Sequence, residues 1–75
     1  MTNLHYMAWL DIDPKRTAAE KLAQGAARYA EHFGERPRVV LVNVADAEAQ
    51  PPEGTRLQVV GYIRVHNYWF GMEGP

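Results

Sequence analysis

The sequence predicts a small α/β (α+β) fold, in which a single helix packs on one face of a three- to four-stranded mixed sheet. Two segments whose apolar residues alternate with a period of two predict strands, and one segment with helical spacing lies between a turn and a glycine. The order is β-α-β-β with an optional terminal strand. With 75 residues, we expect a single small globular domain over residues 1–75, too short for separate cofactor and substrate domains.

The first strand is predicted over residues 4–12, where two sets of side chains alternate. We expect the apolar set to meet the helix; it consists of Leu4, Tyr6, Ala8, Leu10 and Ile12. The mixed set points the other way and consists of His5, Met7, Trp9 and Asp11.

The helix is predicted over residues 17–33. Thr17 and Glu20 have the spacing of a capping box, and Gly34 followed by Pro37 marks the end. The expected buried stripe consists of Ala19, Leu22, Ala26, Tyr29, Ala30 and Phe33. The expected solvated residues are Lys21, Arg28 and Glu31. Gly25 falls on the buried side, where it costs about 1 kcal/mol relative to alanine. Its presence predicts a close approach of helix and sheet.

The second half of the chain predicts two or three further strands. Residues 38–44 form a β-branched run typical of a central strand, parallel to the first and adjacent to it or one strand away. Residues 45–55 form a loop that is either a hairpin or a crossover, with a short helical turn over residues 46–50. Residues 57–65 are predicted as an antiparallel third strand, with Leu57, Val59, Ile63 and Val65 on one face. Residues 67–71 form either a final strand or a docking tail.

One helix covers only one face of such a sheet. The opposite face is then rich in the residue types that are enriched at protein interfaces. The predicted interaction surface consists of Met7, Trp9, Val60, Tyr62, Arg64 and Trp69. We expect Trp9 and Tyr62 at its centre. One alternative is that the loop and the tail of the same chain cover this face. Another is that a different protein binds it.

The most favoured function is a non-enzymatic interaction module that self-associates as a homodimer through an aromatic sheet face or edge. A chain of this length buries a small core and has no cysteine for a disulfide, so association is the remaining common source of stability. We expect no cofactor, no metal and no membrane partner. The N-terminal segment mixes polar and apolar residues unlike a signal peptide, so we expect a cytoplasmic location.

The main alternative is a small nucleic-acid-binding protein, although the net charge of −1 gives no overall attraction to phosphates. Its phosphate contacts would come from Lys15, Arg16, Arg36, Arg38, Arg56 and Arg64. Its stacking platforms would be Trp9, Tyr62, Tyr68 and Trp69.

A remote alternative is Mg²⁺-dependent phosphotransfer or nuclease chemistry at Asp11 and Asp13, two carboxylates at the end of the first strand. The string WLDIDPKRT resembles the first motif of haloacid dehalogenase-type phosphatases, but the chain has no room for that family's other motifs. The same stretch resembles small dimeric CRISPR-associated endoribonucleases, in which Asp11 would match an aspartate after strand 1 and residues 15–16 a basic run. That family's second helix after strand 3 has no counterpart here.

Overall fold

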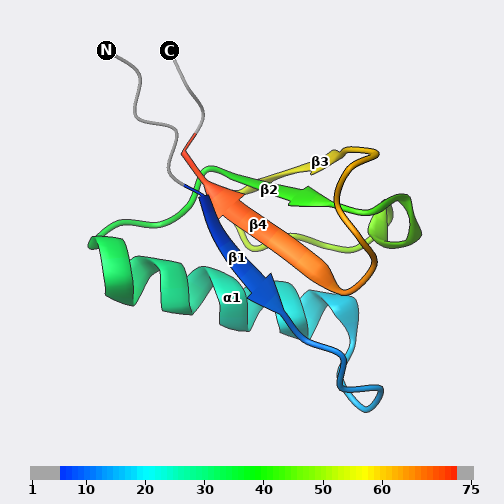
Figure 1. The fold of residues 1–75 in the computed structure, drawn as a ribbon. Coiled ribbons are helices and arrows are strands. Elements are labelled where there is room, and N and C mark those ends of the chain that lie inside the picture. Colours follow the sequence, from blue (N-terminus) through cyan, green and yellow to red (C-terminus); the bar gives the residue numbers. More distant parts are fainter. Residues whose placement is uncertain (1–5, 73–75) are drawn as a thin grey trace.

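The computed structural model describes residues 6–72 and combines one α-helix with a four-stranded sheet (Figure 1). The strands are β1 (Tyr6–Leu10), β2 (Val39–Val42), β3 (Arg56–Val59) and β4 (Asn67–Gly71), and the helix is α1 (Ala18–Phe33). A 3₁₀ turn, η1 (Val44–Asp46), follows β2. The predicted fold class is confirmed. No helix within residues 6–72 is long and apolar enough to cross a membrane.

The sheet order is β1-β4-β2-β3, which makes the optional terminal strand a central one. Strand β4 runs antiparallel to both β1 and β2, so β1 and β2 are parallel and one strand apart, as predicted. The prediction of an antiparallel third strand is wrong, because β3 pairs with β2 in parallel. Residues 43–55 therefore form a crossover and not a hairpin.

The ends of α1 match the sequence prediction. The Thr17 side chain accepts a hydrogen bond from the Glu20 backbone N–H at 3.1 Å, and the Glu20 carboxylate accepts one from the Thr17 N–H at 2.8 Å. The pKa of Glu20 is lowered, first because the Thr17 backbone N–H donates to its carboxylate and then because the Thr17 side chain also hydrogen-bonds to it, and both contacts favour the charged form. Gly34 ends the helix in the left-handed conformation (φ 81°), and its N–H bonds to the Ala30 carbonyl.

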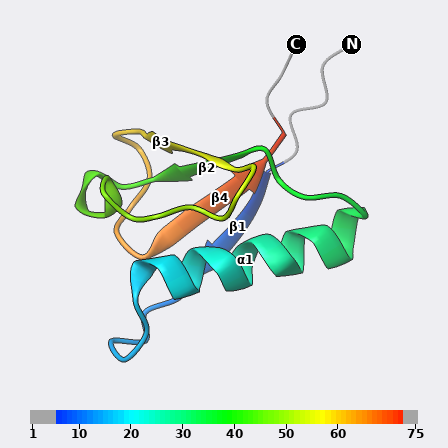
Figure 2. The same ribbon diagram turned by 180° about the vertical axis from the view of Figure 1, so that it is seen from behind.

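The main core lies between α1 and the sheet (Figure 2). Its buried members are Leu22, Ala26, Tyr29, Val40, Val42, Tyr68 and Phe70. Gly25 allows the close approach that its position predicts: a Cβ on this residue would lie 2.3 Å from Cε2 of Phe70. The stripe extends to Lys21, which is buried against expectation, while Ala19 and Phe33 are exposed. Phe33 belongs to the last turn, beyond the part of the helix that the strands cover.

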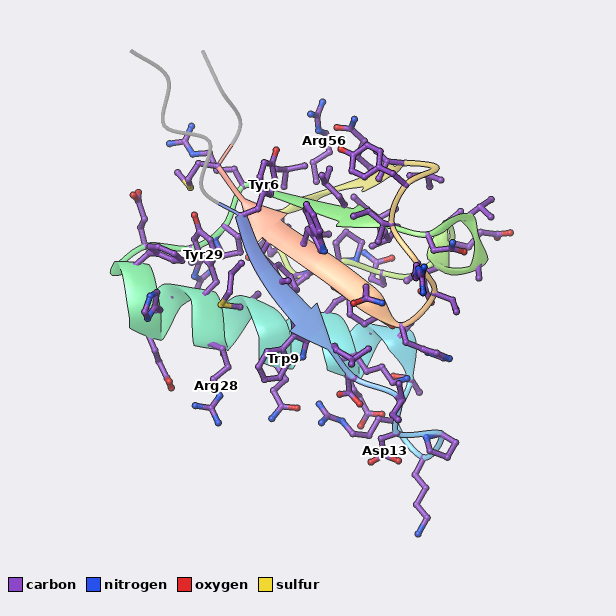
Figure 3. All side chains as sticks on the ribbon, in the orientation of Figure 1. Tyr6, Trp9, Asp13, Arg28, Tyr29 and Arg56 are labelled. Atoms are coloured by element: carbon purple, nitrogen blue, oxygen red, sulfur yellow. The ribbon has the colours of Figure 1, made fainter. Side chains whose placement is uncertain are left out.

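The predicted orientation of the first strand is wrong. Met7 and Trp9 pack against the main core, whereas Leu10 and Ile12 are 61% and 67% exposed. Figure 3 shows Trp9 between β1 and α1. Leu4 and His5 lie outside the described residues. Both sets of alternating side chains contain large apolar groups, so the alternation alone could not decide which set meets the helix.

The predicted strand over residues 57–65 ends early, at Val59. Residues 60–66 leave the sheet and cross the face opposite the helix on their way to β4. Ile63 is buried there against Val39 and Leu41, with Val60 and Trp69 beside them. This second, smaller core corresponds to the alternative in which the chain covers its own face. The covering segment is residues 60–66, not residues 45–55, which pack Ala49 against the main core.

Candidate interaction surface

Three aromatic side chains form a row across the face of the sheet opposite α1. The ring centroid of Trp69, on β4, lies 6.5 Å from that of Tyr6 on β1 and 6.3 Å from that of Tyr62 in the 60–66 segment. Tyr6 is 37% exposed and Tyr62 is 71% exposed. We call these three residues the aromatic row. It presents ring surface to solvent from three separate parts of the chain.

A hollow of about 240 Å³ opens at one end of the aromatic row. Its lining consists of Tyr62, Ile63, Arg64, Asn67 and Trp69. Pockets for drug-sized ligands span about 300–1,000 Å³, so this hollow suits a single ring or a small polar group. The guanidinium of Arg64 and the amide of Asn67 are its polar groups.

The segment that builds this hollow is held in place by side-chain hydrogen bonds. The Asn43 amide donates to the Ile63 carbonyl at 2.9 Å, and the Asn67 amide donates to the Val65 carbonyl at 3.3 Å. His66 joins the segment to β4 in the left-handed conformation, with φ of 70°. Its carbonyl accepts a hydrogen bond from the Asp11 N–H at 3.1 Å, which continues the β1–β4 pairing. These contacts hold Tyr62 and Arg64 above the sheet.

Charge is distributed unevenly between the two sides of the sheet. Within residues 6–72, every Asp and Glu belongs to the 11–17 loop, to α1 and its C-terminal end, or to the 43–55 crossover. The four strands and residues 60–66 carry no acidic residue, but they include Arg56 and Arg64. Arg56 also lines an open hollow with Arg38 at the start of β2 and β3. The helix-free face therefore combines aromatic rings with cations.

The predicted interaction surface is partly gathered on this face. Val60, Tyr62, Arg64 and Trp69 lie there together, around the second core and the hollow. Placing Met7 and Trp9 on this face is wrong, because β1 points them toward α1. Sequence reasoning missed Tyr6 and Asn67. A usable signal for Tyr6 was its hydroxyl, which suits a solvent-facing strand position better than the indole of Trp9 does.

Strand β1 forms one edge of the sheet. The Asp11 N–H donates to His66, so in the alternating ladder Trp9 and Met7 make the backbone bonds with β4. The N–H and C=O groups of Tyr6, Ala8 and Leu10 then point away from β4. Within residues 6–72, no strand pairs with this side of β1. The strand contains neither a charged residue nor proline, two features that usually protect sheet edges.

Asp11 and Asp13 organise the turn before α1. Asp11 forms an ion pair with Arg16 at 3.1 Å and accepts a hydrogen bond from the Asp13 N–H at 3.1 Å. The Asp13 carboxylate accepts a hydrogen bond from the Lys15 N–H at 2.9 Å. Both carboxylates therefore have a structural role, because each one stabilises the turn before α1.

Within residues 6–72, Tyr68 has the most strongly shifted side-chain pKa. Its side chain lies in the main core, on the face opposite that of Trp69, and is 1% exposed. Burial raises the pKa of its hydroxyl to about 12, and the negative charges of Asp46 and Asp11 act in the same direction. The hydroxyl therefore stays protonated throughout the physiological range. The stacking role predicted for Tyr68, and that for Trp9, is excluded by their place in the core.

Known proteins give no match to this chain: no family model fits it, and neither the curated proteins nor the solved structures contain a match. The features of this chain that indicate a function are the edge of β1 and the face that carries the aromatic row.

Proposed function

We propose that the chain is a non-enzymatic interaction module that self-associates as a homodimer by pairing β1 with β1 of a second copy. The observation that carries this proposal is the unprotected edge of β1. Unpaired backbone groups on such an edge are a template for another strand. Pairing would satisfy them and extend the sheet across both copies.

The sequence of β1 suits antiparallel pairing with itself about Ala8. In that register Tyr6 faces Leu10 of the second copy, and Met7 faces Trp9. Each such pair joins an aromatic to an aliphatic side chain, a favourable cross-strand combination. The smallest side chain of the strand lies on the two-fold axis, where two copies of one residue must meet.

The other edge of the sheet supports the choice of β1. Strand β3 carries Arg56 and Gln58 on exposed positions, and the Arg56 guanidinium lies 3.5 Å from the Gln58 amide oxygen. A charged side chain on an edge strand disfavours pairing with another strand, and β1 has none. Self-pairing is therefore favoured at one edge only.

Light scattering after gel filtration, over a range of concentrations, tests the dimer. The wild-type chain should approach twice its monomer mass as concentration rises. Ala8→Lys places two like charges on the two-fold axis and should give a monomer. Gln58→Lys, on an exposed position of the opposite edge, is the matched control and should remain dimeric. A wild-type monomer at all concentrations would refute the proposal, and a dimer unaffected by Ala8→Lys would refute this interface.

The proposal includes a cytoplasmic location for the module. Fractionation of cells that produce a tagged chain tests this part, with membrane or extracellular recovery as the contrary result.

A further inference from the structure

We propose that the helix-free face of the sheet binds single-stranded nucleic acid, with bases stacking on the aromatic row and phosphates held by Arg64. This binding function is distinct from dimerisation, because it uses side chains on the face of the sheet and not the backbone groups at the edge of β1. Tyr6 is the one residue that both proposals use. Three observations support it: the exposed rings, the hollow beside them and the distribution of charge.

The aromatic row supplies stacking surface. Tyr6, Trp69 and Tyr62 come from β1, β4 and the 60–66 segment, and their centroids are spaced by 6.5 and 6.3 Å. Rings displayed on an open sheet are the platform that several RNA-binding folds use for unpaired bases. Stacking tolerates any base because each base has a π-face. A single-stranded nucleic acid that crossed the sheet from β1 toward the 60–66 segment would contact all three rings.

The hollow beside Tyr62 and Trp69 supplies polar contacts at the end of this path. Arg64 and Asn67 line it together with the two rings. An amide and a guanidinium beside aromatic walls can bond to the edge of a base while the rings contact its face. The volume of about 240 Å³ limits the occupant to a single ring or a small polar group.

Charge complementarity favours a polyanion on this face. The strands and residues 60–66 bear arginines and no carboxylate, while the described acidic residues lie on the helix, the link that follows it, the crossover and the 11–17 loop. The arginine pair Arg38 and Arg56 extends the cationic area to the start of β2 and β3. Figure 3 shows Arg56 and Arg28 on opposite sides of the molecule.

Single strands fit these features better than the other polyanions do. A duplex keeps its bases stacked inside, so the aromatic row would remain unused. An acidic peptide would use the arginines but lacks bases to stack on Trp69 and its neighbours. Both are therefore comparison ligands in the test.

The direct experiment is titration of the isotope-labelled chain with oligothymidylate at low salt, followed by backbone and side-chain NMR. We expect the largest shift changes at Tyr62, Arg64 and the Trp69 indole, and small changes on α1. An abasic oligonucleotide of equal length, the matching duplex and polyglutamate are titrated in parallel, and each should bind more weakly. Absence of binding at low salt, changes confined to α1, or equal binding of polyglutamate would each overturn the proposal.

Variants then separate stacking from charge, with affinity read from anisotropy of a labelled oligothymidylate. Tyr62→Ala should weaken binding about five- to a hundredfold, the effect of losing one stacking platform. Arg64→Gln should reduce the slope of log K against log salt by about 0.7, one phosphate contact to a single strand.

Arg28→Gln is the matched control for charge, since Arg28 is an exposed arginine of α1 that pairs with Glu31 at 3.7 Å. It should leave affinity and slope near wild type. Equal losses for Arg28→Gln and Arg64→Gln would indicate nonspecific attraction and refute the site. Binding by a chain that proves monomeric would leave this inference standing while the dimer fails.

Discussion

The two faces of the sheet are closed by different means. On one face the 16-residue helix α1 buries a continuous core that includes Leu22, Tyr68 and Phe70 at 1% exposure or less. On the other face a segment without regular structure buries Ile63 against β2. Beside that small core, Tyr6, Leu10 and Tyr62 remain exposed.

The helix side therefore supplies most of the buried core, and the other side supplies the exposed aromatic and charged groups. The chain has enough residues for one long helix, so the second face receives only the 60–66 segment that links β3 to β4. That link must pass over β2, and it covers β2 but not β1. The aromatic row extends from Tyr6 on the uncovered strand β1 to Tyr62 on the covering segment. Substitutions in either core should therefore change the free energy of unfolding, most of all on the helix side, and those of exposed residues in the aromatic row should mainly change binding.

The largest effect is expected at Phe70, at the centre of the helix side. Its side chain is fully buried and lies where Gly25 brings the helix closest to the sheet. Phe70→Ala should lower the free energy of unfolding by about 3–5 kcal/mol, through lost burial and the cavity left behind. Urea denaturation followed by circular dichroism measures it. A loss below about 1 kcal/mol would contradict the central place of this contact.

A smaller effect is expected at Ile63, which is buried in the second core on the face opposite α1. Ile63→Ala should cost about 2–3 kcal/mol, the lower part of the range for such truncations, because its cluster has few buried members. It should also loosen the segment that carries Tyr62 and Arg64. The same denaturation assay measures the cost, and a loss equal to that of Phe70→Ala would show that the two faces contribute alike.

The sequence predicted the local features of the helix side well. Three of these features each depend on one or two residue types and their spacing along the helix. They are the capping box of Thr17 and Glu20, the cap at Gly34 and the close approach at Gly25. The burial of Lys21 was not predictable in this way. Its position follows from where the crossover and strands lie around the helix, which is set by distant parts of the chain.

The open side was harder to predict because it depends on strand order. Nothing in residues 67–71 alone shows that β4 inserts between β1 and β2. The parallel sense of β3 likewise depends on a crossover that contains no α-helix. Tyr62 and Arg64 lie on the helix-free face as predicted, although the strand whose alternation placed them there ends at Val59. Met7 and Trp9 were misplaced because either set of β1 side chains could have faced the helix.

High pH offers a third comparison, since only the helix side buries a tyrosine hydroxyl with a pKa of about 12. An unfolded tyrosine titrates near pH 10. The folded state holds the Tyr68 proton more tightly, so this stabilisation is complete below about pH 10 and is lost as pH rises toward 12. The loss should reach about 2–3 kcal/mol. Tyr68→Phe should make unfolding less pH-dependent there, with a residual loss from Tyr29, whose pKa burial also raises.

The smallest effect on stability is expected at Tyr62, the most exposed member of the aromatic row at 71%. Its ring touches Trp69 edge-on, with centroids 6.3 Å apart, and buries little apolar area. Tyr62→Ala should change the free energy of unfolding by no more than about 0.5 kcal/mol, as exposed positions usually do. Urea denaturation beside Phe70→Ala and Ile63→Ala checks this. A loss above about 2 kcal/mol would place Tyr62 in the second core and weaken its assignment to a binding surface. A near-zero loss, together with weakened oligothymidylate binding, would show that this ring serves recognition and not folding.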